Sequence, residues 1–351
     1  MPDPAAVVTG RAVATPFGGS VAENCAALLA GRTAFSVPGH FDAKGRRLGV
    51  DHELDGGSGS RAVRLLEKLR SAVDFPIPAG TRLFLATTVG AIDLLEAGAE
   101  TDTSAALLAA AERIFALPNG VLVSAACASG QTAVSIALEQ LAAGICRHAL
   151  VVGADVASEF VTAGFAALGA VSPDVCRPYD ADRNGLTLGE SAAAVLLSPR
   201  GDGPGRILGA AENCDAAHIT APDLEGRQLR RIIRRLTERG PVGGIIGHGT
   251  GTVYNDQAEI AALRAVFPAG PPPLFSLKGN FGHTLGATGV LQLALGLELA
   301  RSRRMPPQAG LRRAMPGANV AGAARELDNS VMLSLNVGFG GLNSAVLLEA
   351  L

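Results

Sequence analysis

The sequence predicts an α/β fold built from two similar halves. Short aliphatic or β-branched runs alternate with alanine-rich stretches of helix length, which is the pattern of strands and helices in an α/β sheet. Two long segments, 121–141 and 274–300, repeat one plan of apolar strand, turn and helix without a polar face. With 351 residues, the chain also exceeds the ~250–300 residues at which a single hydrophobic core stops growing.

The N-terminal half shows this alternation clearly. We predict a strand at Ala5–Thr9, a helix at Val21–Ala30 and a second strand at Leu83–Thr88. Gly, Pro, Ser and Asp cluster in two loops, at Asp55–Ser60 and at Ser198–Gly205. The second loop divides the chain near its middle.

Residues 61–73 form a predicted amphipathic helix. Its apolar side chains recur near helical spacing, whereas Arg61, Arg64 and Lys68 lie off that stripe. We therefore expect these three cations on an exposed helix face.

Composition excludes several classes of function. A net charge of −2, no Trp and only two Tyr give neither the basic field nor the stacking surfaces of a nucleic-acid-binding protein. The five cysteines are scattered, without the close pairs of a metal site, which indicates a reducing compartment. No charge-free apolar run reaches the ~18 residues of a membrane span. We expect a soluble, cytoplasmic protein that binds no metal.

Cys127 is the candidate nucleophile. It follows an apolar strand and precedes a helix, where the helix dipole and unpaired backbone N–H groups lower a thiol pKa. A lone cysteine is more often buried and inert, and we expect that of Cys25, Cys146, Cys176 and Cys214.

Two histidines in glycine-rich turns strengthen the interpretation of Cys127. His248 and His283 each follow an apolar strand, and their flanking glycines allow a ligand to approach the backbone. Neutral imidazoles at these positions could polarise a thioester carbonyl or hold an enolate oxygen. Structural roles are expected for the other histidines: His40, His52, His148 and His218.

Two further features leave alternatives open. Lys278 is either a buried cation paired with Asp256 or Glu259, or an exposed lysine in a turn, and spacing alone does not decide. The turn at 336–341 is either an ordinary hairpin or a backbone N–H donor to an oxyanion. Its glycines lack the spacing of a nicotinamide site.

Five motifs in order resemble the elongating β-ketoacyl synthases of fatty-acid and type II polyketide assembly, within the thiolase superfamily. The resemblance covers nearly the whole chain, with a shortened N-terminal half. The motifs are SAACASG around Cys127, RPYDADRNGLTLGE at 177–190, GHGTGTVYNDQAE at 247–259, SLKGNFGHTLGATG at 276–289 and NVGFGGLN at 336–343.

The resemblance implies a role for each motif. Cys127 would carry the acyl group, His248 and His283 would promote decarboxylation, and Lys278 would orient them with Glu259 as its anionic partner. The remaining implied sites are an oxyanion hole from the backbone N–H groups of Cys127 and Phe339, a gate at Phe339, phosphopantetheine contacts at Thr250 and Thr252, and an acyl-pocket residue at Phe165.

The same resemblance implies a thiolase fold, with halves 1–200 and 201–351 packed as a five-layered αβαβα sandwich. It implies no bound cofactor, substrates carried on an acyl carrier protein, and a homodimer or a heterodimer with a ketosynthase-like subunit. Arg61, Arg64 and Lys68 are the candidate docking residues for the carrier.

Two departures from the family pattern, Gly247 in place of Ala and Leu342 in place of Thr, suggest a reshaped pocket mouth. The alternatives are an acyltransferase or hydrolase without condensation, and a non-catalytic partner subunit. Chain-length factors of this family lose the nucleophile, which this chain keeps.

Overall fold

The computed structural model describes residues 5–351, in which ten strands form two halves of five. The strands of the first half are β1 (Ala6–Ala14), β4 (Thr81–Ala86), β5 (Val121–Val123), β6 (His148–Asp155) and β7 (Ser191–Ser198). Those of the second half are β8 (Gly205–Cys214), β9 (Gly244–Ile246), β10 (Leu274–Phe275), β13 (Val331–Gly338) and β14 (Leu342–Ala350).

The two halves share one topology. Their strand orders are β5-β4-β6-β7-β1 and β10-β9-β13-β14-β8, so each half places its third, second, fourth, fifth and first strands side by side. The first three strands of each order are parallel, and the last two are antiparallel to their neighbours. The halves meet where the start of β1 pairs with the start of β8. This arrangement confirms the predicted fold of two similar α/β halves.

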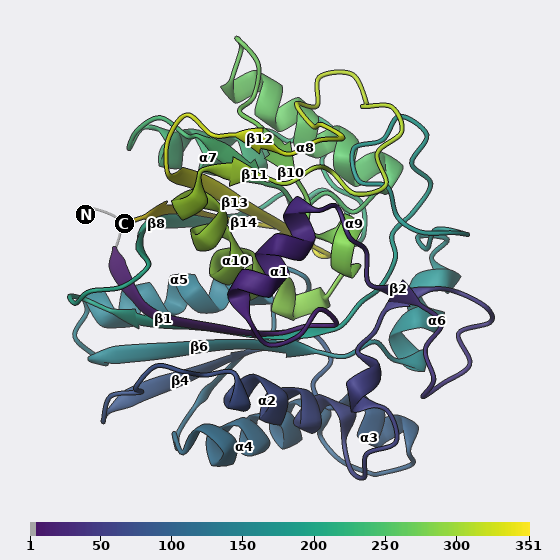
Figure 1. The fold of residues 1–351 in the computed structure, drawn as a ribbon, viewed down its shortest axis with the longest axis vertical. Helices are drawn as coiled ribbons and strands as arrows, with labels where there is room; N and C mark the ends of the chain where they lie inside the picture. The colour runs from purple at the N-terminus through teal and green to yellow at the C-terminus, as the bar shows by residue number, and fades with distance from the viewer. Residues whose placement is uncertain (1–4) are drawn as a thin grey trace.

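Helices and sheets form five layers (Figure 1). The outer layer of the first half holds α2 (Arg61–Ser71) and α4 (Thr103–Phe115), and that of the second holds α7 (Arg227–Thr237) and α8 (Val253–Val266). The central layer holds α5 (Ser129–Ala142) and α10 (Thr288–Ser302), which contact strands of both halves. Among the described residues, no helix is both long and apolar enough to cross a membrane.

Smaller elements complete the chain. They are α1 (Val21–Leu29), α3 (Ile92–Glu96), α6 (Glu159–Ala167), α9 (Lys278–Phe281), the 3-10 turns His52–Leu54 and Leu285–Ala287, and the short strand pairs β2 (Phe35–Ser36) with β3 (Leu48–Gly49) and β11 (Arg304–Met305) with β12 (Arg325–Glu326).

The central helix α10 has no polar face because both of its sides are covered, whereas only eight of the fourteen residues of α5 are buried. Twelve of the fifteen residues of α10 are buried, and its leucines join the largest hydrophobic cluster together with side chains from both sheets. Burial of each leucine contributes roughly 1.5–3 kcal/mol. The sequence pattern of 121–141 and 274–300 thus predicted the layer that joins the halves.

Predicted elements of the first half match the structure closely. The helix at 21–30 and the strand at 83–88 agree with α1 and β4 to within two residues, and the helix at 61–73 corresponds to α2. The strand at 5–9 is longer than predicted, since β1 runs on through Gly10 to Ala14. All strands of one half precede residue 200 and those of the other follow it, and we keep the domain boundary at this position as a proposal.

Candidate active site

Cys127 lies in the turn between β5 and α5, the third strand of the first half and its following helix. Ala126 immediately before it has φ +49°, a left-handed conformation that is strained for a residue with a side chain. The turn is held by Ser129, whose hydroxyl oxygen accepts from the N–H of Ala125 at 2.8 Å and donates to the carbonyl of Ala126 at 2.5 Å. The thiol is therefore placed at a rigid, strained corner.

The environment of this thiol differs from the sequence-based expectation of a lowered pKa. Cys127 is only 5% exposed, and burial raises its pKa to about 12. The charge of Lys278 acts in the opposite direction and is the largest factor that lowers the thiol pKa. The prediction was wrong because a solvated helix end lowers a thiol pKa, whereas this helix end is covered by protein.

His283 follows β10, the third strand of the second half, at the position that corresponds to Cys127 in the first. Its backbone is fixed to the neighbouring loop, because its N–H donates to the carbonyl of Thr187 at 2.7 Å. Its ring Nδ1 accepts from the N–H of Leu285 at 3.1 Å. The proton of the neutral ring therefore lies on Nε2.

His248 follows β9, the second strand of the second half, and Lys278 at the start of α9 lies beside it. The Lys278 ammonium donates to the His248 carbonyl at 2.5 Å and lies 3.3 Å from Nδ1 of the ring. An ammonium can only donate, so this contact also leaves the His248 ring proton on Nε2. Lys278 is 1% exposed, which decides between the two readings left open by its spacing.

Glu259 does not form the ion pair with Lys278 that the sequence predicted. Glu259 accepts instead from the backbone N–H groups of His248 at 2.7 Å and Gly249 at 2.9 Å, and from the hydroxyl of Tyr179 at 3.0 Å. Glu259 thus braces the His248 backbone and acts on Lys278 only through its charge. Sequence spacing placed the two residues in one region but could not distinguish an ion pair from a carboxylate that binds backbone amides.

The two imidazoles form an edge-to-face pair with ring centroids 5.5 Å apart. Burial lowers both pKa values well below the usual value for histidine, and the charge of Lys278 lowers them further. Burial also lowers the pKa of Lys278, to about 8. Near neutral pH the site therefore combines two neutral rings, each with an Nε2–H donor, and a cation beside them.

Cys127 and both histidines line one cavity of about 410 Å³. Thr250, Thr252, Phe165 and Phe339 also line it, so the structure brings together the predicted nucleophile, histidines and substrate-contact residues. The hydroxyls of Thr250 and Thr252 lie 2.9 Å apart. The ring of Phe339, 37% exposed in the β13–β14 turn, lies 5.6 Å from that of Phe165.

The end of β13 lies directly against the Cys127 turn. A Cβ added to Gly338 would lie 3.1 Å from the carbonyl oxygen of Ala125 and 3.4 Å from the amide nitrogen of Cys127. The approach favours glycine, because a Cβ here would require the Cys127 turn to shift by a few tenths of an ångström. The glycine-rich turn is a hairpin, and its Phe339 lines the cavity. Donation from a backbone N–H of this turn to an oxyanion stays a prediction.

Sequence reasoning missed two buried polar residues that join the loops of the site. Asp155 at the end of β6 accepts from Thr87, Thr88 and Gly286, and thereby connects the loop after β4 to the loop that follows His283. Gln292 on α10 donates to the carbonyl of Gly247 at 3.1 Å. Both lie in apolar runs, and the only available signal was a polar residue within such a run.

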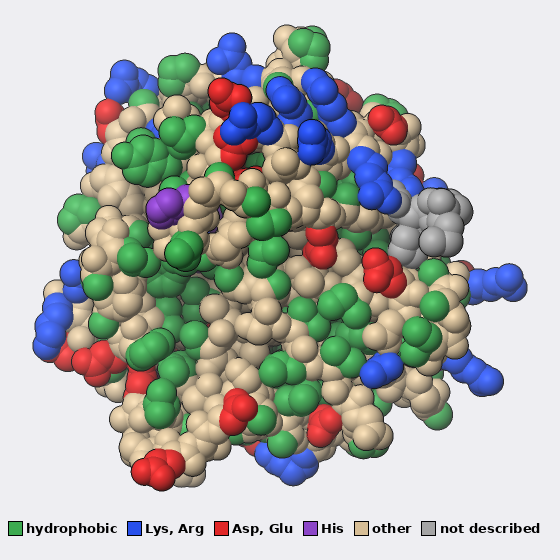
Figure 2. All heavy atoms as spheres, turned by 180° about the vertical axis from the view of Figure 1, so that it is seen from behind, with side chains coloured by type: hydrophobic (Ala, Val, Ile, Leu, Met, Phe, Trp, Pro, Cys, Tyr) green, Lys and Arg blue, Asp and Glu red, His purple; other side chains and the backbone are tan. Residues whose placement is uncertain are grey.

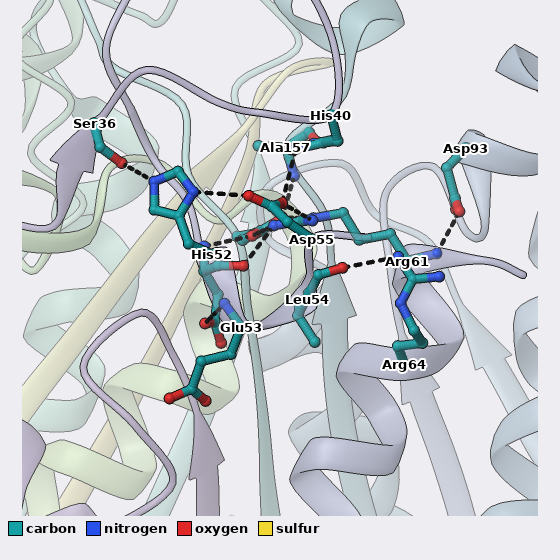
Figure 3. Close-up of polar contacts among 12 residues, drawn as sticks. Ser36, His40, His52, Glu53, Leu54, Asp55, Arg61, Arg64, Asp93 and Ala157 are labelled. Atoms are coloured by element: carbon teal, nitrogen blue, oxygen red, sulfur yellow. Dashed lines mark hydrogen bonds and ion pairs between the residues drawn. The ribbon is translucent and has the colours of Figure 1, made fainter. Parts of the chain in front are cut away.

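The three α2 cations are not exposed as the sequence predicted: Arg61 is buried, and Arg64 and Lys68 are half-buried. Arg61 is 3% exposed and donates to Glu190 at 2.6 Å and to Asp55 at 2.8 Å. Figure 3 shows Arg61 and His52 pointing toward the Asp55 carboxylate. Loops that pack over the N-terminal end of α2 bury its first turn, and helical periodicity alone does not reveal such a cover.

The other two cations of this set are also engaged. Arg64 donates to the backbone carbonyls of Leu54 and Gly59, and Lys68 donates to Asp51 at 2.5 Å and Glu53 at 2.6 Å. We therefore do not retain α2 as a docking surface for a carrier. Exposed arginines occur instead on α7, and Figure 2 shows Lys and Arg side chains gathered over the top of the molecule, where α7 and α8 lie in Figure 1.

Comparison with known proteins identifies the family of this chain. Residues 119–202 match the N-terminal domain of β-ketoacyl synthases and residues 205–312 match the C-terminal domain, together more than half of the chain. The chain belongs to the β-ketoacyl synthase family. The matched segments contain Cys127, His248, Lys278 and His283.

Individual relatives agree with this assignment. The 3-oxoacyl-[acyl-carrier-protein] synthase 2 of Mycobacterium leprae is 30% identical over 63% of this chain, and the match spans 58% of that relative's own length. The ishigamide ketosynthase/chain length factor structure superposes with a TM-score of 0.87 at 26% identity, over 99% of this chain and all of that one. A β-ketoacyl synthase from Burkholderia phymatum gives a TM-score of 0.83 at 26% identity, with the same coverage.

Proposed function

We propose that this chain is a decarboxylating β-ketoacyl synthase that takes its acyl groups from an acyl carrier protein. The observation that carries the proposal is the pair of neutral imidazoles. Both have Nδ1 occupied by an internal donor, so both offer Nε2–H beside a single cavity cysteine. A non-catalytic partner subunit would have no use for this arrangement.

In the first step the Cys127 sulfur, as the thiolate, attacks the thioester carbonyl of the acyl carrier. The charge of Lys278 favours the thiolate. The tetrahedral oxyanion would be held by the backbone N–H groups of Cys127 and Phe339. The packing of Gly338, the residue before Phe339, against the Cys127 turn supports this role. Collapse of this intermediate breaks the carbon–sulfur bond to the carrier, whose thiolate takes up the proton that Cys127 lost.

In the second step a malonyl thioester enters the same cavity. Breaking the bond to its carboxylate releases carbon dioxide and leaves an electron pair as an enolate, whose oxygen accepts from the two Nε2–H groups. The enolate carbon then attacks the acyl carbonyl on Cys127. The new carbon–carbon bond forms as the Cys127 thiolate departs, and the β-ketoacyl product remains on the carrier.

The experiment separates the two steps. Intact-mass analysis measures acyl transfer from acyl and malonyl carrier proteins, and product analysis measures condensation. Cys127→Ala should abolish acyl loading, whereas His283→Ala should retain part of the loading and lose decarboxylation by ~10²-fold or more. Loading followed only by hydrolysis would favour the hydrolase alternative, and no loading of the wild-type chain would favour a partner subunit.

We also propose that the active form is a dimer, with a second copy or with a related ketosynthase-like subunit. The proposal is supported by the place of β5, the strand that leads to Cys127, at the edge of its sheet, where a strand of another chain could pair with it. Light scattering of the purified chain, alone and with a candidate subunit, tests this. A monomer that condenses at full rate would contradict it.

A further inference from the structure

Gly247 stands immediately before His248, and the structure explains why this position has no side chain. A Cβ added there would lie 2.0 Å from the hydroxyl of Tyr179 and 2.8 Å from Oε1 of Glu259. Real Cβ atoms do not approach other atoms so closely. The departure from Ala seen in the sequence is therefore coupled to Tyr179.

Tyr179 is fully buried and held at both its backbone and its hydroxyl. Its φ of +59° is a strained, left-handed conformation for a residue with a side chain. Its N–H donates to Asp256 at 2.8 Å and its carbonyl accepts from the N–H of Met315 at 2.8 Å. Such strain persists only where the surrounding structure imposes it, so the ring is fixed in direction.

The ring of Tyr179 supports the His248 loop from behind. Its hydroxyl donates to Oε2 of Glu259, the carboxylate that accepts from the N–H groups of His248 and Gly249. Its ring also packs against Gly249, where a Cβ would lie 2.5 Å from Cζ. Two glycines thus let one aromatic ring touch the backbone on both sides of His248.

We propose that Tyr179 is a positioning residue for His248. Its hydroxyl fixes Glu259, Glu259 fixes the backbone at His248 and Gly249, and Gly247 provides the space that this hydroxyl needs. The inference rests on the proposed function, because the property that it controls is the direction of the His248 ring toward the enolate.

Glu259 makes these contacts, which we call the Tyr179–Glu259–His248 brace, sensitive to pH. Burial is the main cause that raises its pKa, to about 7, and the nearby carboxylate of Asp256 raises it further. The N–H groups of His248 and Gly249 and the Tyr179 hydroxyl lower it. Two other charged groups face this cluster. One is Lys278, whose pKa the charge of Glu259 raises, and the other is Arg183, which lies 3.7 Å from Asp256.

The sign of the effect follows from these contacts. The ionised carboxylate accepts all three donors, so activity should fall as the pH drops through the Glu259 pKa. Tyr179→Phe removes one donor to the ionised form, which raises the Glu259 pKa and moves the acidic limb of the pH profile to higher pH. A loss of packing alone would lower the rate without moving this limb.

Three variants test the proposal: Tyr179→Phe, Gly247→Ala and the double variant. We expect Tyr179→Phe to lower kcat for malonyl decarboxylation by about 10-fold, the scale of one hydrogen bond to a charged group, with KM little changed. Gly247→Ala should lower it by about 10²-fold. In the double variant the clash with the hydroxyl is gone, so kcat should recover by about 10-fold from Gly247→Ala, in part only because Leu274 and Glu259 stay close.

The control is Gly322→Ala, whose Cβ would meet no heavy atom of residues 5–351 within 4 Å, and it should match the wild type in thermal unfolding and in rate. An acidic limb that does not move in Tyr179→Phe, or a double variant slower than Gly247→Ala, would overturn the proposal. If the wild type fails to decarboxylate malonyl thioesters, the proposed function fails instead. The brace is then tested by a carbon-13 NMR titration of Glu259, whose pKa should rise in Tyr179→Phe, and an unchanged value would refute it.

Discussion

Replacing Lys278 by Met tests the cation at the centre of the proposed mechanism. Methionine keeps an unbranched, apolar side chain but removes the ammonium that donates to the His248 carbonyl and faces Nδ1 of its ring. The ring proton of His248 is then free to occupy either nitrogen, and the Nε2–H donor to the enolate is no longer fixed. Loss of one preorganised donor lowers kcat by about 10²–10³-fold.

The pH profile gives a second, sharper measure. In the wild type the rate requires ionised Glu259, with a pKa of about 7, and protonated Lys278, with a pKa of about 8. Two groups with these pKa values give a bell-shaped pH–rate profile with its maximum near pH 7.5. The fraction of enzyme in the active protonation state falls about sevenfold from this maximum by pH 6 and by pH 9. Lys278→Met should retain the acidic limb and lose the basic one.

The assay is carbon dioxide release from malonyl carrier between pH 5.5 and 9.5, with acyl loading of Cys127 followed in parallel by intact mass. Loading should also fall, because Lys278 is the main charge that stabilises the Cys127 thiolate. Lys44→Met is the matched control, since Lys44 is an exposed lysine paired with Asp42. A basic limb that persists in Lys278→Met, or a loss below about 10-fold, would refute the assigned role.

Three further predictions concern reactivity and stability. Cys214 is exposed, whereas the sequence predicted a buried and inert thiol. Iodoacetamide at pH 7 should therefore modify Cys214 before Cys127, because a pKa of about 12 leaves Cys127 almost wholly protonated; peptide mass analysis that finds Cys127 first would contradict this. Arg61→Ala should lower the free energy of unfolding in urea by about 3–5 kcal/mol, since it leaves the buried Glu190 carboxylate without its cation, and a loss below about 1 kcal/mol would argue against the ion pair. Burial raises the Asp155 pKa to about 6, so ionisation of this carboxyl lowers the free energy of unfolding progressively as the pH rises from about 4 to 6. Asp155→Asn should remove about 3 kcal/mol of this pH dependence. Equal changes of unfolding free energy with pH in both proteins would disprove the prediction.

Arg61 in the polar cluster of Figure 3 is a residue whose burial helical periodicity does not predict. Helical spacing correctly predicted α2 with an apolar stripe, and two leucines of that stripe, Leu66 and Leu69, are buried in the core. It assigned Arg61 to the solvent because a polar residue off the apolar stripe usually faces water. The carboxylate of Glu190, 129 positions away in the chain, makes the buried side preferable for this arginine.

The Cys127 pKa is a similar case. A strand, a turn and a helix can be recognised from neighbouring residues, and so can the placement of a cysteine at the helix start. The sign of the pKa shift depends on how much protein covers that helix end. The cover comes from distant segments, because Gly286 and Val290 lie against Gly130, and Gly338 lies against the Cys127 turn. The local sequence predicts the helix dipole beside Cys127, whereas only the packed structure shows how far protein replaces water around the thiol.

The sequence alone determined the elements, the duplicated plan and the candidate residues for the chemistry, because strand and helix periods, glycine turns and the Cys-His-His set are properties of short segments. Tertiary structure decided which groups touch. It placed the Cys127 and His283 turns at equivalent positions of two matching halves, assigned Glu259 to backbone amides, and set Tyr179 against Gly247, 68 positions away. Hydrogen bonds and burial act over a few ångströms in space, and the spacing of residues along a chain does not record those distances.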